Sequence, residues 1–439
     1  MRKILLLLIL TNFSAAYSQI LSERDRATLK DEILAERFNI LLPQLMDKTD
    51  IDMWLVISRE YNEDPVMRTM LPATWLNARR RTILVFYNNK EKKIIEKLAV
   101  ARYDVGANIS SAWDKEKQPD QWKALENLIR ERNPNKIGIN ISEHFGITDG
   151  LVKTDYDELL AALPADLESK LVSAEKLAIA WIETRTPKEM KLYNTLVEVT
   201  HQIIDEAFSN KVIVPGKTTT EDVVWWMRQK VTDMGLETWF HPTVDVQRNN
   251  EALKSHIESF SKAKAEDIIL PGDLLHCDFG ITYIGLNTDC QQHAYVLKEG
   301  ENKVPSFLSD AFKKGNRVQD ILTSNFMEGK TGNEILLKSL TDAKTEGLRP
   351  SIYTHPLGTY GHSSGPTIGM WDSQEGVPVT GDYPLYKNTV YAIELNTTVS
   401  IKEWNKDIRI MLEEAGFYGE SGFRYVNKRQ ESIKVIQAK

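Results

Sequence analysis

Acidic residues interrupt apolar, strand-like segments in the second half of this 439-residue chain. Asp278 interrupts one such segment, and Asp289 lies in the segment that returns after a glycine-containing turn. An ionised carboxylate inside a sheet is costly unless it is paired or binds a metal. Two carboxylates on one face repel each other, so a shared cation is the simplest way to neutralise them. A single aspartate of this kind is usually a turn or edge residue, but the pair makes a metal site an equal alternative.

Three further residues strengthen the case for a metal centre. Glu394 is the one acidic residue in an apolar strand pattern, and Glu413 ends another such pattern. His362 lies among glycines; alone, it is more often a hydrogen-bonded loop residue than a metal ligand. Buried acids are rare without partners, so these signals together count for more than any one of them. Carboxylates and imidazole can hold two divalent ions, and the candidate ligands are Asp278, Asp289, His362, Glu394 and Glu413.

The two aspartate segments are expected to pair as antiparallel strands with Asp278 opposite Asp289. The chain's two cysteines, Cys277 and Cys290, would then also be opposite each other, on the other face of the sheet. In an oxidising compartment they could form a cross-strand disulfide if the geometry allows it. The favoured interpretation is two small buried core residues.

The first half of the chain alternates strand and helix patterns. Short apolar, β-branched runs occur at residues 52–58, 81–87, 136–141 and 170–172, and residues 121–132 form a helical pattern. Such alternation predicts an α/β layer domain. Near residue 180, Thr186-Pro187-Lys188-Glu189 has the form of a helix capping box, which predicts a boundary and a new helix. We found no phosphate loop, catalytic triad spacing or metal cluster in this half.

The chain begins with the order of a secretory signal. Arg2 and Lys3 precede the apolar run Ile4–Leu10, and small residues follow up to Ser18. We therefore expect residues 1–18 to be removed and the protein to be exported to the periplasm or the medium. The apolar run is shorter than a membrane span, so no membrane association is expected after cleavage. A net charge of −7 argues against nucleic-acid binding.

The order and spacing of the candidate ligands resembles the pita-bread metallopeptidase family, which includes methionine aminopeptidases, Xaa-Pro aminopeptidases and prolidases. The resemblance rests on the paired aspartates, a Gly-His-x-x-Gly segment around His362 and the two glutamates, over roughly residues 180–430. It implies an α+β chain with a pita-bread domain at residues 179–439. A smaller α/β domain of the creatinase N-terminal type would occupy residues 19–178. The match also selects Glu413, not Glu414, as the final ligand.

The resemblance implies a two-metal peptidase, an Xaa-Pro aminopeptidase or a related aminopeptidase or dipeptidase acting on short peptides. In such enzymes a metal-bridging hydroxide attacks the scissile carbonyl, and the residue matching Glu394 also shuttles the proton. Manganese is the expected metal, with zinc, cobalt or iron as alternatives. A homodimer is expected by analogy.

Some positions depart from the family pattern. His256 is the best candidate for a substrate-contacting histidine, with His241 second. Two histidines usual in the family are replaced by Gly369 and Gly358, and we hypothesise that His355 supplies one missing catalytic imidazole. These departures keep open a non-peptidase member of the fold, either a binding protein or a creatinase-like hydrolase of a small amidine.

Overall fold

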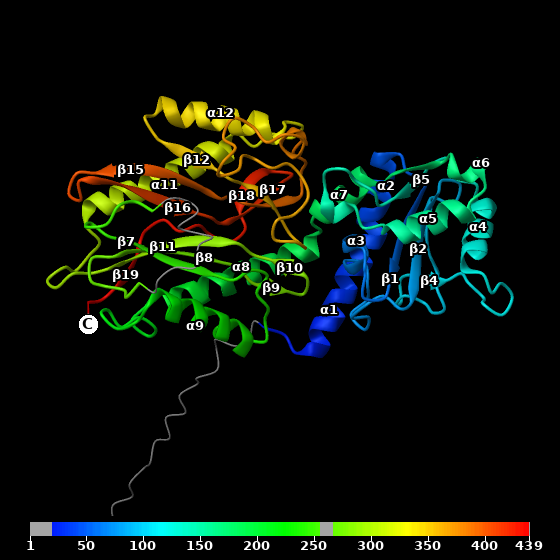
Figure 1. Ribbon diagram of the computed structural model, residues 1–439, viewed down its shortest axis with the longest axis horizontal. Coiled ribbons are helices and arrows are strands. Elements are labelled where there is room, and N and C mark those ends of the chain that lie inside the picture. The colour runs from blue at the N-terminus through cyan, green and yellow to red at the C-terminus, as the bar shows by residue number, and fades with distance from the viewer. Residues whose placement is uncertain (1–19, 255–266, 439) are drawn as a thin grey trace, which may run out of the picture.

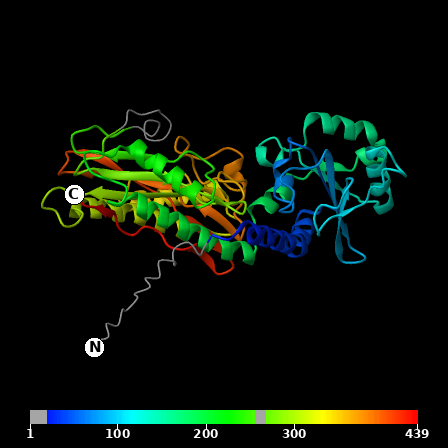
Figure 2. The same cartoon turned by 90° about the horizontal axis from the view of Figure 1, so that it is seen from below.

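The computed structural model describes residues 20–254 and 267–438 of the chain. The predicted signal segment, residues 1–18, and the candidate His256 therefore lie outside the described residues. Two lobes lie side by side, and helix α1 runs between them (Figures 1 and 2). Among the described helices, none is both long enough and apolar enough to cross a membrane.

The N-terminal lobe is built on a mixed six-stranded sheet in the order β4-β3-β2-β1-β5-β6. The strands predicted from the sequence are present, and the structure adds β3, which pairs with β2, and β4, which pairs with β3. Its strands are β1 (Met53–Arg59), β2 (Arg81–Asn89), β3 (Ile94–Val100), β4 (Ser110–Ser111), β5 (Ile137–Ile139) and β6 (Leu171–Ser173). Its helices are α1 (Glu23–Glu36), α2 (Leu42–Thr49), α3 (Pro65–Arg68), α4 (Gln121–Arg132), α5 (Lys153–Ala162), α6 (Ala165–Glu168) and α7 (Glu175–Glu183).

Strand β1 shows why this sheet is covered on both faces. Met53 and Leu55 pack in one apolar core with residues of α4 and α5. Trp54 and Val56 point the other way, into a second core with residues of α2 and α7. Alternate side chains of a strand face opposite sides of its sheet, so a continuous apolar run requires a core on each side.

A capped helix opens the C-terminal lobe, as the sequence predicts. Thr186 accepts a hydrogen bond from the backbone N–H of Glu189, whose side chain returns the bond to the Thr186 backbone. The Glu189 carboxylate is buried and also accepts hydrogen bonds from Arg37 and Arg185, at 2.8–2.9 Å. Because Arg37 comes from the segment after α1, this ion pair ties the start of α8 to the N-terminal lobe.

The C-terminal lobe contains three larger sheets enclosed by helices, with strand orders β19-β11-β8-β7, β12-β15-β16 and β13-β14-β17-β18. Helices α8 and α9 lie on one side of these sheets, and α11 and α12 on the other (Figure 1). The helices are α8 (Pro187–Ala207), α9 (Thr220–Asp233), α11 (Ser306–Ser324) and α12 (Gly332–Thr345). The strands are β7 (Thr243–Gln247), β8 (Leu274–Phe279), β9 (Thr282–Tyr283), β10 (Leu286–Asn287), β11 (Cys290–Val296), β12 (Pro350–Ile352), β13 (His355–Leu357), β14 (Thr389–Ala392), β15 (Leu395–Ile401), β16 (Lys406–Leu412), β17 (Ala415–Gly419), β18 (Gly422–Tyr425) and β19 (Lys434–Ile436).

At three places the chain leaves one sheet and enters another, with a short break between the two consecutive strands. The three breaks lie next to one another. The breaks are at residues 353–354, 393–394 and 413–414. The Tyr353 N–H donates to the Glu394 carbonyl at 3.1 Å, and the Ile393 N–H donates to the Glu414 carbonyl at 2.9 Å. The sequence predicts one continuous strand over residues 390–396 and another over residues 408–415. This prediction is wrong, because each strand is interrupted at its acidic residue. Each apolar run changes sheet where its glutamate lies, because hydrogen bonding moves from one neighbouring strand to another.

The register of β8 and β11 also differs from the prediction. Asp278 lies opposite Gln291, and not opposite Asp289. A two-residue turn at Ile284–Gly285, with φ of 50° and 76°, joins β9 to β10 and sets this register. The shift is two residues, so the aspartates remain on one face. Cys277 and Cys290 are both buried and free, so the core interpretation is confirmed and the disulfide is not formed.

Candidate metal centre

The aligned strand breaks bring all five candidate ligands together, and His355 joins them. The groups Asp278–Asp289–Glu413, His355–Glu394–Glu413 and Asp289–His355–His362 each have ligand atoms within 4.8 Å of one another. Asp278 comes from β8 and Asp289 immediately precedes β11, whereas Glu394 and Glu413 lie in two of the breaks. Residues far apart in the sequence thus converge where the sheets meet.

Burial makes this cluster electrostatically costly without a cation. It raises the pKa of Asp278 to about 6, and burial together with neighbouring carboxylates raises the pKa values of Asp289 and Glu413 well above normal. The pKa of Glu394 is also raised, by burial and then by Asp278. One carboxylate oxygen each of Asp278, Asp289 and Glu413 is buried without a hydrogen-bond partner in the described part of the chain. Such oxygens fit divalent cations, which would neutralise the charge and use the lone pairs.

Gln291 is a part of the site that the sequence analysis missed. Its side-chain amide donates to Glu394 Oε1 at 2.7 Å and to Glu413 Oε2 at 2.8 Å. Its carbonyl oxygen accepts from His276 Nε2 at 3.0 Å, and His276 Nδ1 lies 3.6 Å from Asp245 Oδ1. Gln291 is two residues after Asp289 on a strand and therefore faces the same side. This two-residue spacing from Asp289 is the feature of the sequence that could have identified Gln291 as part of the site.

Glu414, the neighbour of Glu413, faces away from the cluster. It is buried and forms a hydrogen bond of 2.6 Å with His201 Nε2. Its other oxygen accepts from Gln292 Nε2 at 2.7 Å and from the Gln430 backbone at 3.1 Å. These contacts fix the break at residues 413–414 on the side opposite the cluster, while Glu413 points into the cluster.

The remaining sequence candidates lie elsewhere. His241 is exposed and contacts Trp225 and Arg228, outside the cluster. Gly369 has a φ of 75°, and a Cβ at this position would lie 2.2 Å from the Ile352 carbonyl oxygen. The backbone at this position therefore requires glycine.

An aromatic side chain forms a wall beside the cluster. The Trp239 indole donates to the Thr288 carbonyl at 2.8 Å and meets the His362 ring edge-on, with ring centroids 5.3 Å apart. A Cβ at Gly280 or Gly361 would overlap this indole. The two glycines therefore permit the close approach that places the indole next to His362.

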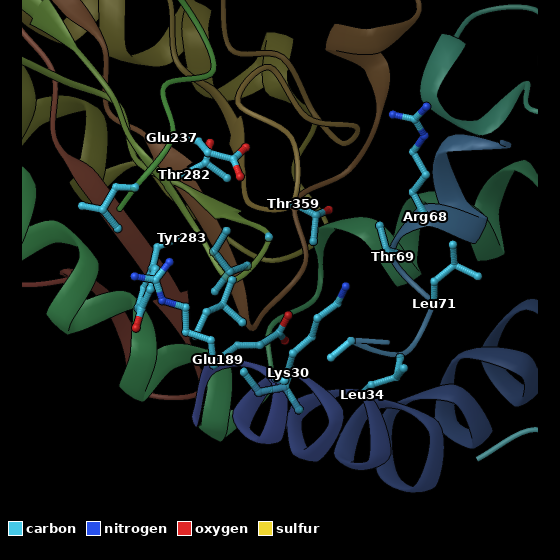
Figure 3. A pocket seen from close by; sticks show the side chains of 18 of the residues that line it. Lys30, Leu34, Arg68, Thr69, Leu71, Glu189, Glu237, Thr282, Tyr283 and Thr359 are labelled. Atoms are coloured by element: carbon cyan, nitrogen blue, oxygen red, sulfur yellow. The ribbon is translucent and has the colours of Figure 1, made fainter. Parts of the chain in front are cut away.

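A separate cavity of about 520 Å³ lies between α1, the β9–β10 turn and the N-terminal lobe (Figure 3). Lys30 extends from α1 into it. Thr359 and Tyr360, on the segment that leads to His362, also line it. The residues that line the cavity thus include close sequence neighbours of His362. None of the six clustered side chains lines the cavity.

Comparison with known proteins identifies the family. The profile of metallopeptidase family M24 matches residues 191–424, which is more than half of the chain, so the protein belongs to this family. No curated protein sequence matches the chain.

Similar solved structures share the two-lobed fold at low identity. An X-Pro aminopeptidase from Thermotoga maritima has a TM-score of 0.62 and 15% identity, covering 89% of this chain and 99% of that chain. An Xaa-Pro dipeptidase from Bacillus anthracis has a TM-score of 0.54 and 18% identity, covering 93% and 99%. The N-terminal domain of the FACT complex subunit SPT16 from Cicer arietinum has a TM-score of 0.52 and 12% identity, covering 94% and 97%. The predicted fold, a pita-bread domain preceded by an α/β domain, is confirmed, and the family supports a metal-dependent peptidase.

Proposed function

We propose that this protein is a two-metal Xaa-Pro aminopeptidase, or a closely related aminopeptidase or dipeptidase. One observation carries the proposal. Four carboxylates and two imidazoles from separate segments of the chain converge in one largely buried cluster, and several of their lone pairs lack partners among the described residues. A purely structural core has no reason to collect so many acids without cations.

The chain's own groups suit peptide hydrolysis. Two divalent cations, when bound, would supply an activated water nucleophile and polarise the scissile carbonyl. Asp278, Asp289 and Glu413 would hold them, together with His362 and Glu394. We assign to Glu394 a second task, transferring a proton to the departing amine, as the resemblance to the family implies. Gln291 holds one oxygen of Glu394 and leaves the other available for that transfer.

The substrate class rests on the similar structures and on the site wall. An X-Pro aminopeptidase and an Xaa-Pro dipeptidase share both lobes with this chain. The Trp239 indole beside His362 offers an apolar face that fits a proline ring. His256 keeps its proposed role of contacting the substrate.

A second candidate is a non-peptidase on the same fold. A FACT complex subunit shares this architecture, so the fold alone does not define an activity. The missing side chain at Gly369 favours this alternative, since a group expected near the substrate is absent. The other non-peptidase alternative is a creatinase-like enzyme that hydrolyses a small amidine. The acidic cluster weighs against both, because neither requires it.

A matched peptide panel tests the proposal. The metal-free protein is reloaded with manganese or zinc and given peptides with proline at the second position, their alanine counterparts, and the same peptides with an acetylated amino terminus. Release of the first residue from only the free-amino proline peptides is the expected result. Cleavage of the proline and alanine peptides alike would refute the proline preference. Cleavage of none of them by metal-loaded protein would favour the non-peptidase alternative.

The cellular setting and assembly are part of the proposal. We propose an exported protein that functions as a homodimer with manganese. Detection of a chain starting at residue 19 outside the cytoplasm would support export. Sedimentation of the purified protein would test the dimer.

A further inference from the structure

We infer that His201, Cys290 and Glu414 form a second metal site, for zinc or a similar divalent cation, on the side of the sheet opposite the acidic cluster. The inference goes beyond the proposed function, because none of these residues belongs to the metal centre described above. Their ligand atoms lie within 4.8 Å of one another, and all three residues are buried. An imidazole, a thiolate and a carboxylate are the ligand types that zinc uses in proteins.

Two pairs of consecutive residues place this site directly behind the acidic cluster. Asp289 immediately precedes β11 and Cys290 begins it, while Glu413 and Glu414 form the break after β16. Consecutive residues of an extended chain face opposite sides. Asp289 and Glu413 therefore face the acidic cluster. Cys290 and Glu414 face the other way, toward helix α8, which carries His201.

The distances within the site fit a cation after a small adjustment. Cys290 Sγ lies 3.6 Å from Glu414 Oε2, and a sulfur and an oxygen bound tetrahedrally to one zinc ion lie roughly 3.5 Å apart. His201 Nε2 forms a hydrogen bond of 2.6 Å with the same oxygen, and a cation between them would lengthen this distance to roughly 3.3 Å. His201 Nδ1 has no hydrogen-bond partner in the described structure, so the imidazole proton can reside there. The thiol proton is released to solvent as the metal–sulfur bond forms.

Gln292 supplies an independent observation at the same place. It lies two residues after Cys290 on β11 and therefore faces the same side. Its amide nitrogen donates to Glu414 Oε1 at 2.7 Å. Its carbonyl oxygen is buried without a hydrogen-bond partner among residues 20–254 and 267–438, and the residue is only 2% exposed. An unused buried acceptor is costly, and a cation held by the other three residues would have this oxygen available as a fourth ligand.

The second site would hold together the two segments that carry the acidic cluster. The backbones of Gln291 and Glu413 already exchange hydrogen bonds, at 3.0 and 3.2 Å. A cation bound by Cys290 and Glu414 would join the same two segments through their side chains. Because the site is buried, the role of this cation is structural, and it has no open position for a substrate.

Cobalt provides a readout that the acidic cluster cannot give. The protein is produced in cobalt-supplemented medium and kept reduced, so that a buried site fills during folding. A thiolate bound to cobalt absorbs strongly in the near ultraviolet by charge transfer, whereas the acidic cluster contains no sulfur. We expect this absorption in the wild type and its loss in Cys290→Ala. The control is Cys277→Ala, which removes a buried thiol of β8 that lies outside the proposed site and should keep the absorption.

Wild-type protein without this absorption would overturn the inference, and this measurement needs no variant to fold. Absorption that persists in a folded Cys290→Ala variant would overturn it as well, because the sulfur ligand would then be Cys277. The outcome is independent of the proposed function. Cobalt–sulfur absorption in a protein that cleaves no peptide would leave the inference intact, and peptide cleavage by a protein without it would refute only the inference.

Discussion

Asp278 pairs directly with Gln291 across strands β8 and β11, so an amide and a carboxylate share the face that carries the metal cluster. The amide donates to both Glu394 and Glu413, at 2.7 and 2.8 Å. Both acceptors are acids whose pKa values burial raises. Gln291 is thus the neutral group that fixes two ligands without adding charge.

Gln291→Glu tests this role because it changes charge and keeps size. A fifth carboxylate next to Glu394 and Glu413 should destabilise the metal-free protein by about 2–4 kcal/mol, and the stabilisation gained on adding metal should increase. Urea unfolding with and without manganese measures both effects. The exposed Gln229→Glu is the control, with an expected change below about 0.5 kcal/mol. Equal unfolding of the Gln291→Glu variant and the wild type without metal would contradict the assigned role.

Glu394→Gln should remove the proton transfer and keep the fold. The expected loss in kcat is about 10²–10⁴-fold on a proline-containing peptide. Saturating metal is used so that weaker binding does not limit the rate, and bound metal is measured in the same samples. Glu403→Gln, at an exposed position, should retain full activity. A metal-loaded Glu394→Gln variant with wild-type kcat would exclude Glu394 as the proton carrier.

The stability of the metal-free protein should fall as pH rises. Burial raises the pKa of Asp278 from its usual 3.8 to about 6, and Asp289, Glu394 and Glu413 shift the same way. The folded state therefore holds more protons than the unfolded state above about pH 4, and it loses stability as these groups ionise. Melting temperatures between pH 5 and 8 should decrease without metal. With metal bound the decrease should disappear, because cations favour the ionised ligands. A metal-free melting temperature that rises with pH would contradict the cluster's electrostatics.

Glu183 gives a similar test away from the metal centre. Burial raises its pKa from 4.5 to about 8, although Lys48 and Arg185 oppose the shift. Both carboxylate oxygens lack a hydrogen-bond partner in the described structure. The carboxyl is protonated in the fold at pH 7 and ionised in the unfolded chain, which costs up to about 3 kcal/mol. This cost grows as pH rises from about 4.5 to 8.

Glu183→Gln should therefore flatten the pH dependence over that range, relative to the wild type. Urea unfolding at several pH values, with metal bound to suppress the cluster's contribution, measures the difference. An identical slope in variant and wild type would show that Glu183 is not protonated in the fold.

Several features of the fold follow from local patterns in the sequence. The capping box at Thr186 and the helix at residues 121–132 occur where predicted, because both depend on neighbouring residues alone. The alternating strands and helices also predicted the α/β layers of the first lobe. The acids at positions 278, 289, 394 and 413 indicated a shared site, since buried carboxylates need a common partner.

Other features depend on contacts that a linear pattern does not contain. The pairing of β8 with β11 is set by a turn centred at Ile284–Gly285, and a shift of two residues keeps the same apolar pattern. The breaks at Glu394 and Glu413 arise because the strands exchange neighbours there. The spacing from Asp289 places Gln291 on the same face, but the hydrogen bonds of Gln291 to Glu394 and Glu413 and the position of His355 Nε2 beside Asp289 required the three-dimensional arrangement.

The most direct test of the account is peptide cleavage as a function of bound metal. Metal-free protein is titrated with manganese, and product from a free-amino Xaa-Pro peptide is followed by mass spectrometry at each measured stoichiometry. The account predicts no cleavage without metal and full activity once two equivalents are bound, with release of the first residue only. Cleavage that persists in metal-free protein, or its absence with two equivalents bound, would contradict the account.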